Sequence, residues 1–122
     1  MKSYADLDIY KISYSLALDV HRLSMKLPKY ELYETGSQVR RSSKSIPSNI
    51  VEGYGRRRYH AEFIRFLIFS HSSCDETIVH LNFIKDLYEN LKEEAIQLIE
   101  KYIELSKKLY KFIEYVETKW KP

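Results

Sequence analysis

The chain has 122 residues, of which 44% are hydrophobic and 30% charged, and its formal net charge is +3. This length is typical of one domain, and the single cysteine excludes an internal disulfide bond. No apolar run reaches the roughly 18 residues of a membrane helix, and the acidic N-terminal segment lacks the apolar stretch of a signal peptide. We therefore expect one cytoplasmic domain over residues 1–122, with no membrane partner.

Apolar side chains recur every three or four residues along most of the chain, the spacing that places them on one face of a helix. The pattern predicts helices near residues 6–27, 31–55, 60–88 and 92–119. No segment shows sustained alternation of apolar and polar residues, so no strand is predicted. Short connections force consecutive helices to run antiparallel, and we expect an all-α, up-down-up-down four-helix bundle.

The second predicted helix contains Pro47 in its interior, where proline usually kinks or breaks a helix. The apolar spacing keeps its phase through Ile46 and Ile50, which favours one kinked helix. The alternative is a new helix that begins at Pro47. A continuous helix would free the Ser43 carbonyl, and we expect a nearby polar group such as the Asn49 amide to bond to the freed backbone.

Small residues follow the apolar side of this helix, including Gly36, Ser43 and Gly53. They predict that another backbone approaches it closely. The helix is expected to end around residues 53–55, because glycine commonly ends helices.

The fourth predicted helix carries a second apolar stripe beside its main one. Its members are Ile96, Ile99, Ile103, Tyr110, Ile113 and Trp120. One interpretation is an interface with another subunit, because large exposed apolar patches usually mark interfaces. The other is a single wide stripe that packs into the core of its own chain.

Arginine is concentrated in one segment. Six of the seven arginines lie within residues 40–65, where together with Lys44 and against two glutamates they give a net charge of +5, and the rest of the chain carries −2. This asymmetry favours a localised anionic partner, and arginine binds phosphate with two parallel hydrogen bonds. The candidate nucleic-acid-binding residues, for RNA more than DNA, are Arg40, Arg41, Lys44, Arg56, Arg57, Arg58 and Arg65.

A structural role for the same arginines is the main alternative. Arg41 is then expected to pair with Glu52 or Glu62, within the chain or across a subunit boundary. Arg65 is expected to pair with Glu62, which is three residues away on the same helix. In that case the protein is an oligomeric scaffold whose partner is another protein.

The sequence contains no pattern that predicts catalysis or a cofactor. The serines of residues 42–48 lie on a predicted helix rather than in a nucleophile elbow, so we expect no enzyme. A di-metal bundle needs Glu-x-x-His pairs, whereas Glu76 and His80 are four residues apart and have no second copy. His71, Cys74 and Asp75 are close enough to bind a metal weakly, but Cys74 lies on an apolar face and is expected to be a buried thiol. We therefore predict no metal and no cofactor.

Residues 38–67, QVRRSSKSIPSNIVEGYGRRRYHAEFIRFL, resemble the signature of the 23S ribosomal-RNA intervening-sequence proteins. The segment ADLDIYKISYSLALDVHRLSMKLP resembles the first helix of that family. The resemblance implies an antiparallel four-helix bundle that assembles as a homopentamer. It also implies kinship with accessory proteins of diversity-generating retroelements, which are basic pentamers that work with a reverse transcriptase and its RNA.

The chain departs from this family at the turn before the third helix. Many relatives have Ser or Thr caps after the arginine pair, whereas this chain has Arg58, Tyr59 and His60. The departure increases the positive charge of the turn and leaves the cap of the third helix open.

Overall fold

The computed structural model describes residues 3–121, which form helices and short connections without a strand. The expected domain of residues 1–122 also includes Met1, Lys2 and Pro122, which lie outside the described part. The elements are η1 (Tyr4–Asp6), α1 (Asp8–Ser24), α2 (Lys29–Leu32), α3 (Thr35–Gly55), α4 (His60–Leu87), η2 (Glu89–Leu91) and α5 (Lys92–Lys119).

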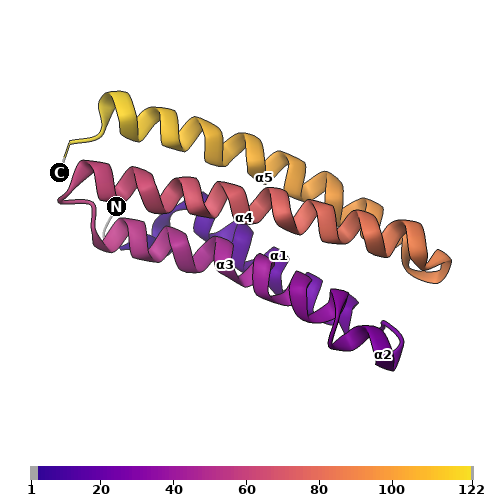
Figure 1. Cartoon of the computed structure of the whole chain (residues 1–122). Coiled ribbons are helices and arrows are strands. Elements are labelled where there is room, and N and C mark those ends of the chain that lie inside the picture. Colours follow the sequence, from indigo (N-terminus) through magenta and orange to yellow (C-terminus); the bar gives the residue numbers. More distant parts are fainter. Residues whose placement is uncertain (1–2, 122) are drawn as a thin grey trace.

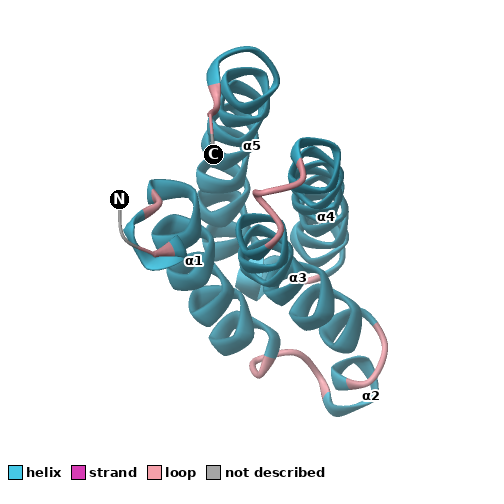
Figure 2. Ribbon diagram, turned by 90° about the vertical axis from the view of Figure 1, so that its left-hand side faces the viewer, coloured by secondary structure: helices cyan, strands magenta, loops and turns pink. Residues whose placement is uncertain are grey.

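The four long helices form an antiparallel bundle in which α3 packs against α1 and α4, and α5 packs against α4 and α1. The chain ends and the α3–α4 turn lie at one end of the bundle, and α2 and the α4–α5 connection lie at the other (Figure 1). Seen from the side of the chain ends, α3 stands between α1 and α4 (Figure 2). The predicted all-α, up-down-up-down bundle is confirmed.

The core is built from the apolar stripes of all four helices. Each buried aliphatic or aromatic side chain of this kind stabilises the fold by about 1.5–3 kcal/mol relative to an exposed one. Fully buried members are Val20, Val39, Ile46, Ile50, Phe63, Leu67, Leu81, Ile84, Leu105 and Leu109. Together with other buried residues they form one hydrophobic core cluster.

The bounds of the first two predicted helices differ in the structure. Helix α1 ends at Ser24 rather than near residue 27, and the second predicted helix is divided into α2 and α3. Glu31 explains the division, because its carboxylate accepts the N–H of Thr35 in the first turn of α3, at 3.2 Å, and the hydroxyl of Tyr88. The bonds from Tyr88 and Thr35 hold the pKa of Glu31 below its usual value.

Helix α3 continues through Pro47, as predicted, and its axis changes direction near the middle (Figure 1). The expected bond from Asn49 to the Ser43 carbonyl does not form. The Asn49 amide donates instead to the carbonyl of Ser45, at 2.8 Å. Beside the proline, the buried hydroxyl of Ser70 on α4 donates to the Ile46 carbonyl, at 2.9 Å, and links the two helices.

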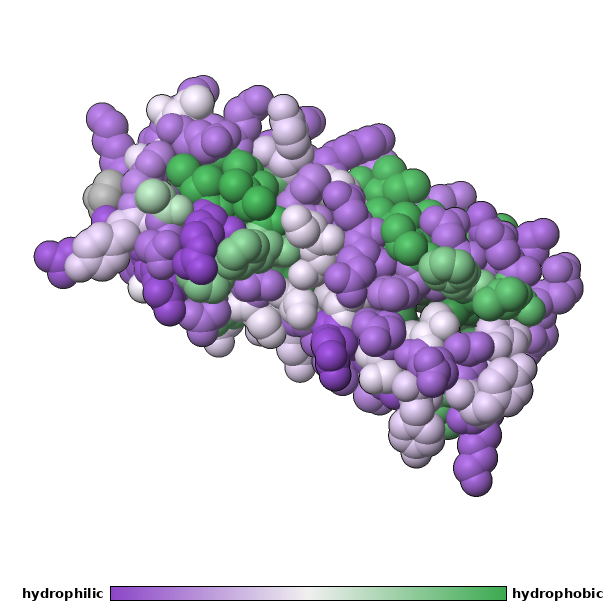
Figure 3. Space-filling view, in the orientation of Figure 1, coloured by the Kyte–Doolittle hydropathy of each residue, from purple (hydrophilic) through white to green (hydrophobic). Residues whose placement is uncertain are grey.

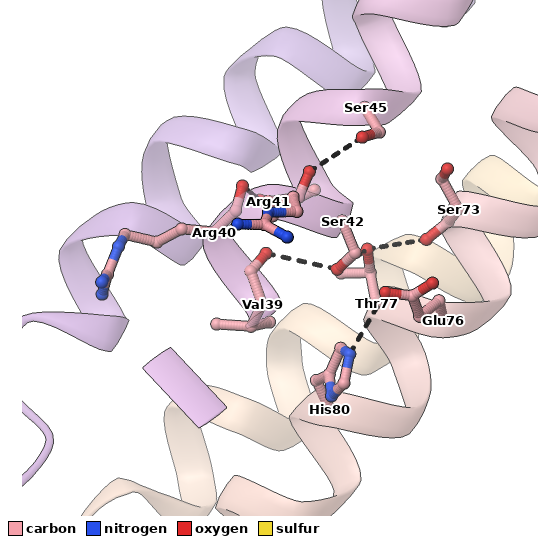
Figure 4. A network of polar contacts seen from close by, with 10 residues as sticks. Val39, Arg40, Arg41, Ser42, Ser45, Ser73, Glu76, Thr77 and His80 are labelled. Atoms are coloured by element: carbon pink, nitrogen blue, oxygen red, sulfur yellow. Dashed lines mark hydrogen bonds and ion pairs between the residues drawn. The ribbon is translucent and has the colours of Figure 1, made fainter. Parts of the chain in front are cut away.

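Helices α3 and α4 approach closely at small residues, as expected. A Cβ atom added to Gly53 would lie 3.1 Å from the Phe66 Cβ and 3.2 Å from the Phe63 carbonyl oxygen. Farther along, the buried hydroxyls of Ser42 and Thr77 are 2.9 Å apart (Figure 4). Helix α3 ends at Gly55 in ordinary negative-φ geometry, so no left-handed glycine is used to end it.

The second apolar stripe of the fourth predicted helix is partly buried in this chain. In α5, Ile99, Ile113 and Trp120 pack against the core, which supports one wide stripe, although Ile103 and Tyr110 stay exposed. Helix α4 instead exposes apolar side chains along its outward face (Figure 3). They are Ile68, Phe69, Val79, Phe83 and Leu87. Among residues 3–121, no helix is long and apolar enough to span a bilayer.

The hydroxyl of Tyr102 generates a prediction about stability. It is fully buried and has no hydrogen-bond partner among the described residues, and burial raises its pKa. Tyr102→Phe should increase the free energy of unfolding by about 1–3 kcal/mol, because an unpaired buried polar group is removed. Tyr88→Phe is the matched control and should lower stability, since it removes the bond to Glu31. Thermal melts at one protein concentration measure both, and a clear loss of stability in Tyr102→Phe would contradict the prediction.

Candidate nucleic-acid interface

The seven predicted residues fall into two groups in space. Arg40, Arg41 and Lys44 lie on the first half of α3, whereas Arg56–Arg58 form the α3–α4 turn and Arg65 lies one to two turns into α4. The rise of an α-helix separates the two groups by about 20 Å. This is long enough for several nucleotides, so the two groups are compatible with one extended ligand.

Arg40 has a structural role. Its guanidinium donates to the hydroxyl of Ser24, at 2.9 Å, and to the carbonyl of Leu32, at 2.8 Å. Both acceptors lie at C-terminal ends of helices, α1 and α2, where unpaired carbonyls attract cations. The side chain therefore joins three helices and points away from α4 (Figure 4).

Arg41 and Lys44 are exposed, and neither forms an ion pair within residues 3–121. Within the chain, Glu52 and Glu62 pair with other arginines and not with Arg41. A pair between Arg41 and a glutamate of another subunit stays a prediction. The ammonium of Lys44 lies 3.1 Å from Nδ1 of His21 on α1. Burial, followed by the charges of Lys44, Arg40 and Arg22, lowers the pKa of His21.

Arg56 and Arg65 share one carboxylate. Glu62 accepts from both guanidinium groups, each at 3.2 Å, which confirms the predicted Arg65–Glu62 pair. Arg56 also lies 3.6 Å from Glu52, and both arginines lie over the ring of Phe66. The two arginines and two glutamates are together neutral, so this group adds little to the local positive potential.

The remaining two arginines of the turn differ from each other. Arg57 is half-buried, stacks on the ring of Tyr54 at 4.1 Å and donates to the Tyr54 carbonyl at 2.9 Å. Arg58 is exposed and has no ion-pair or hydrogen-bond partner in the described part of the chain. Tyr59, at the start of α4, forms no side-chain capping bond. The charge of Arg58, the additional arginine of this turn, stays exposed to solvent.

The candidate site thus reduces to three exposed cations without a carboxylate partner, Arg41, Lys44 and Arg58. The sequence did not indicate His21, which lies 23 residues before Lys44 and reaches it only because α1 packs against α3. Its neighbour Arg22, the one arginine outside residues 40–65, forms a 3.5 Å pair with Asp19.

The residues considered for metal binding or catalysis have other contacts. The Cys74 thiol is fully buried and donates to the Tyr102 carbonyl, and burial together with Asp75 raises its pKa to about 12. His71 lies 3.1 Å from the hydroxyl of Ser106, and His80 lies 3.3 Å from Glu76. Across residues 3–121, no three His, Cys, Asp or Glu side chains gather in a metal-binding group.

These features define a small four-helix bundle that presents basic residues on α3 and on the α3–α4 turn. The family model of the 23S rRNA-intervening sequence protein matches residues 5–111, and the chain belongs to that family. No curated protein matches the sequence. The family membership that residues 38–67 indicated is therefore confirmed.

The contrast between Arg40 and Arg58 gives a prediction. Arg40→Ala should lower the free energy of unfolding by about 1–3 kcal/mol, because it leaves the Leu32 carbonyl and the Ser24 hydroxyl without their donor. Arg58→Ala is the matched control and should change stability by less than about 0.5 kcal/mol, as is usual for exposed positions. Urea titration followed by circular dichroism measures both. Equal effects of the two substitutions on the free energy of unfolding would contradict the structural role of Arg40.

Proposed function

We propose that this protein is a non-enzymatic, homo-oligomeric module that binds RNA through the phosphodiester backbone. The observation that carries the proposal is that three exposed cations have no carboxylate partner among the described residues: Arg41 and Lys44 on α3, and Arg58 in the turn after it. Exposed guanidinium and ammonium groups bind phosphate and release its counterions, which is the main source of backbone affinity.

One further feature favours RNA, and a second concerns specificity. The description of the family refers to 23S rRNA. The basic residues of the site also lie on helix surfaces and a turn, where they contact phosphates rather than base edges, so the binding is expected to be largely independent of sequence. A link to diversity-generating retroelements, with a reverse transcriptase as protein partner, remains part of the proposal, and so does a cytoplasmic location.

Self-association is proposed to occur through the outward face of α4. Its exposed apolar residues extend from Ile68 to Leu87, about 28 Å along the helix. Val79 and Phe83, 51% and 54% exposed, line a hollow of about 170 Å³ with Asn82 and Asp86, which suits an inserted side chain from a second copy. Each added subunit supplies another copy of Arg41, Lys44 and Arg58, so weak phosphate contacts combine into a higher overall affinity. A pentamer is the number that the family resemblance implies.

The scaffold function remains the second candidate. Arg40, Arg56, Arg57 and Arg65 are all engaged within the chain, as that hypothesis requires. Under the scaffold hypothesis, Arg41, Lys44 and Arg58 have no ligand, whereas under the RNA proposal they bind phosphate groups.

A salt titration tests the RNA proposal. In the variant Arg41→Gln/Lys44→Gln/Arg58→Gln, the slope of log affinity for single-stranded RNA against log salt should fall by about 0.7 for each lost contact. The loss should be similar for unrelated RNA sequences, because backbone contacts carry no base information. Fluorescence anisotropy with labelled oligonucleotides measures the slope.

The matched control removes the same charge elsewhere. Lys101→Gln/Lys108→Gln/Lys119→Gln alters three exposed lysines of α5 and should leave the slope close to that of the wild type. The oligomer mass of each variant is checked first, so that lost avidity is not read as lost contacts. Equal slopes for both triple variants, or no RNA binding by the wild type at low salt, would support the scaffold instead.

A second experiment tests assembly. Light scattering of the wild type should give a mass several times 14.6 kDa. Val79→Asp/Phe83→Asp should give a folded monomer, because burying two carboxylates in an apolar contact is unfavourable. Ile103→Asp/Tyr110→Asp changes exposed apolar residues of α5 and should keep the wild-type mass. Loss of assembly only in the α5 variant would move the interface to that helix, and a monomeric wild type would refute self-association.

A further inference from the structure

Two basic side chains contact each other on the surface between α1 and α3. The ammonium of Lys44 lies 3.1 Å from Nδ1 of His21. Because an ammonium can only donate, Lys44 donates a hydrogen bond to Nδ1 of a neutral imidazole. Lys44 is exposed and His21 is half-buried. The contact leaves the remaining protons of Lys44 directed toward solvent, beside the ring.

The surroundings of this pair are positively charged. Arg40 and Arg22 also act on His21, and with Lys44 they all lower its pKa. Arg40 is held in place by Ser24 and Leu32 and supplies a fixed charge, and Arg22 is bound to Asp19, the nearest carboxylate on α1. Arg41 is exposed three residues before Lys44 on α3. The pair therefore has several cations around it and no carboxylate that bonds to it.

We propose that His21 and Lys44 hold one phosphodiester group of a bound RNA between them, and that His21 takes up a proton as the phosphate binds. This inference rests on the proposed RNA-binding function. A phosphate oxygen replaces the direct contact of the two nitrogens, so that each donates a hydrogen bond to the anion. The negative charge offsets the repulsion that otherwise opposes a protonated His21 beside Lys44.

The coupling has a definite sign. Proton uptake on binding makes the affinity for RNA rise as the pH falls through the range in which histidine titrates. A phosphodiester stays a monoanion throughout that range, so the pH dependence comes from the protein. If the phosphate raises the His21 pKa by one unit, RNA affinity increases by up to about tenfold from high to low pH.

The main experiment needs no substitution. The imidazole signals of the protein's four histidines are followed by NMR from about pH 8 to about pH 5.5, with and without a short oligouridine. The His21 pKa is expected to rise on RNA binding, and the imidazole signal of His80, beside Glu76 on α4, is the internal control. A parallel titration with sulfate, which does not titrate in this range, shows whether a free oxyanion has the same effect. A rise with sulfate but not with RNA would overturn the phosphodiester assignment.

Variants provide the second measurement. RNA affinity of His21→Gln should lose most of its pH dependence, and His80→Gln should keep it. Lys44→Gln should weaken RNA binding while raising the His21 pKa in the free protein, a combination that a purely structural lysine would not produce. RNA binding with unchanged pH dependence in His21→Gln would overturn this inference alone. Absence of RNA binding at every pH would overturn the proposed function with it.

Discussion

The close packing of α3 against α4 is the constraint on which the rest of the structure depends. A side chain at Gly53 would fit only tightly beside Phe63 and Phe66. The Ser70 hydroxyl donates to the Ile46 carbonyl next to Pro47. The Thr77 hydroxyl donates to the Ser42 hydroxyl in the same interface. Because polar groups in such a dry contact must be paired, the register of the two helices has little freedom to slide.

That register determines where the arginines lie. With Gly53 against Phe63 and Phe66, the turn between the helices is short and carries Arg56, Arg57 and Arg58 at one end of the bundle. It also brings Glu62 within reach of Arg56, so that one carboxylate neutralises charge on both sides of the turn. The same packing turns Arg41 and Lys44 outward on α3, away from the acids that pair with the other arginines. The separation of paired and unpaired cations is thus a consequence of helix packing.

Burial also separates the apolar residues into two roles. In the second stripe of the fourth predicted helix, Ile99, Ile113 and Trp120 pack against the core. Trp120 lies edge-on against Phe63 at the end of the bundle. Helix α4 packs mainly against α3 and α5, and the apolar side chains on its outward side stay exposed in the described part of the chain. An apolar pattern in a sequence gives the width of a stripe, but the number of neighbouring helices decides how much of it stays exposed.

The sequence by itself determined the helical class, the antiparallel order, the continuity of α3 through Pro47 and the location of the arginine-rich segment. These follow from local spacing, since apolar periodicity and short connections leave few arrangements for the chain. The sequence also indicated the Arg65–Glu62 pair, which lies within one helix turn. Only the tertiary structure decided which arginines are free, that Arg40 binds the ends of α1 and α2, and that His21 meets Lys44. The reason is physical, because these contacts join residues of different helices, and their distances depend on packing and register that local spacing does not encode.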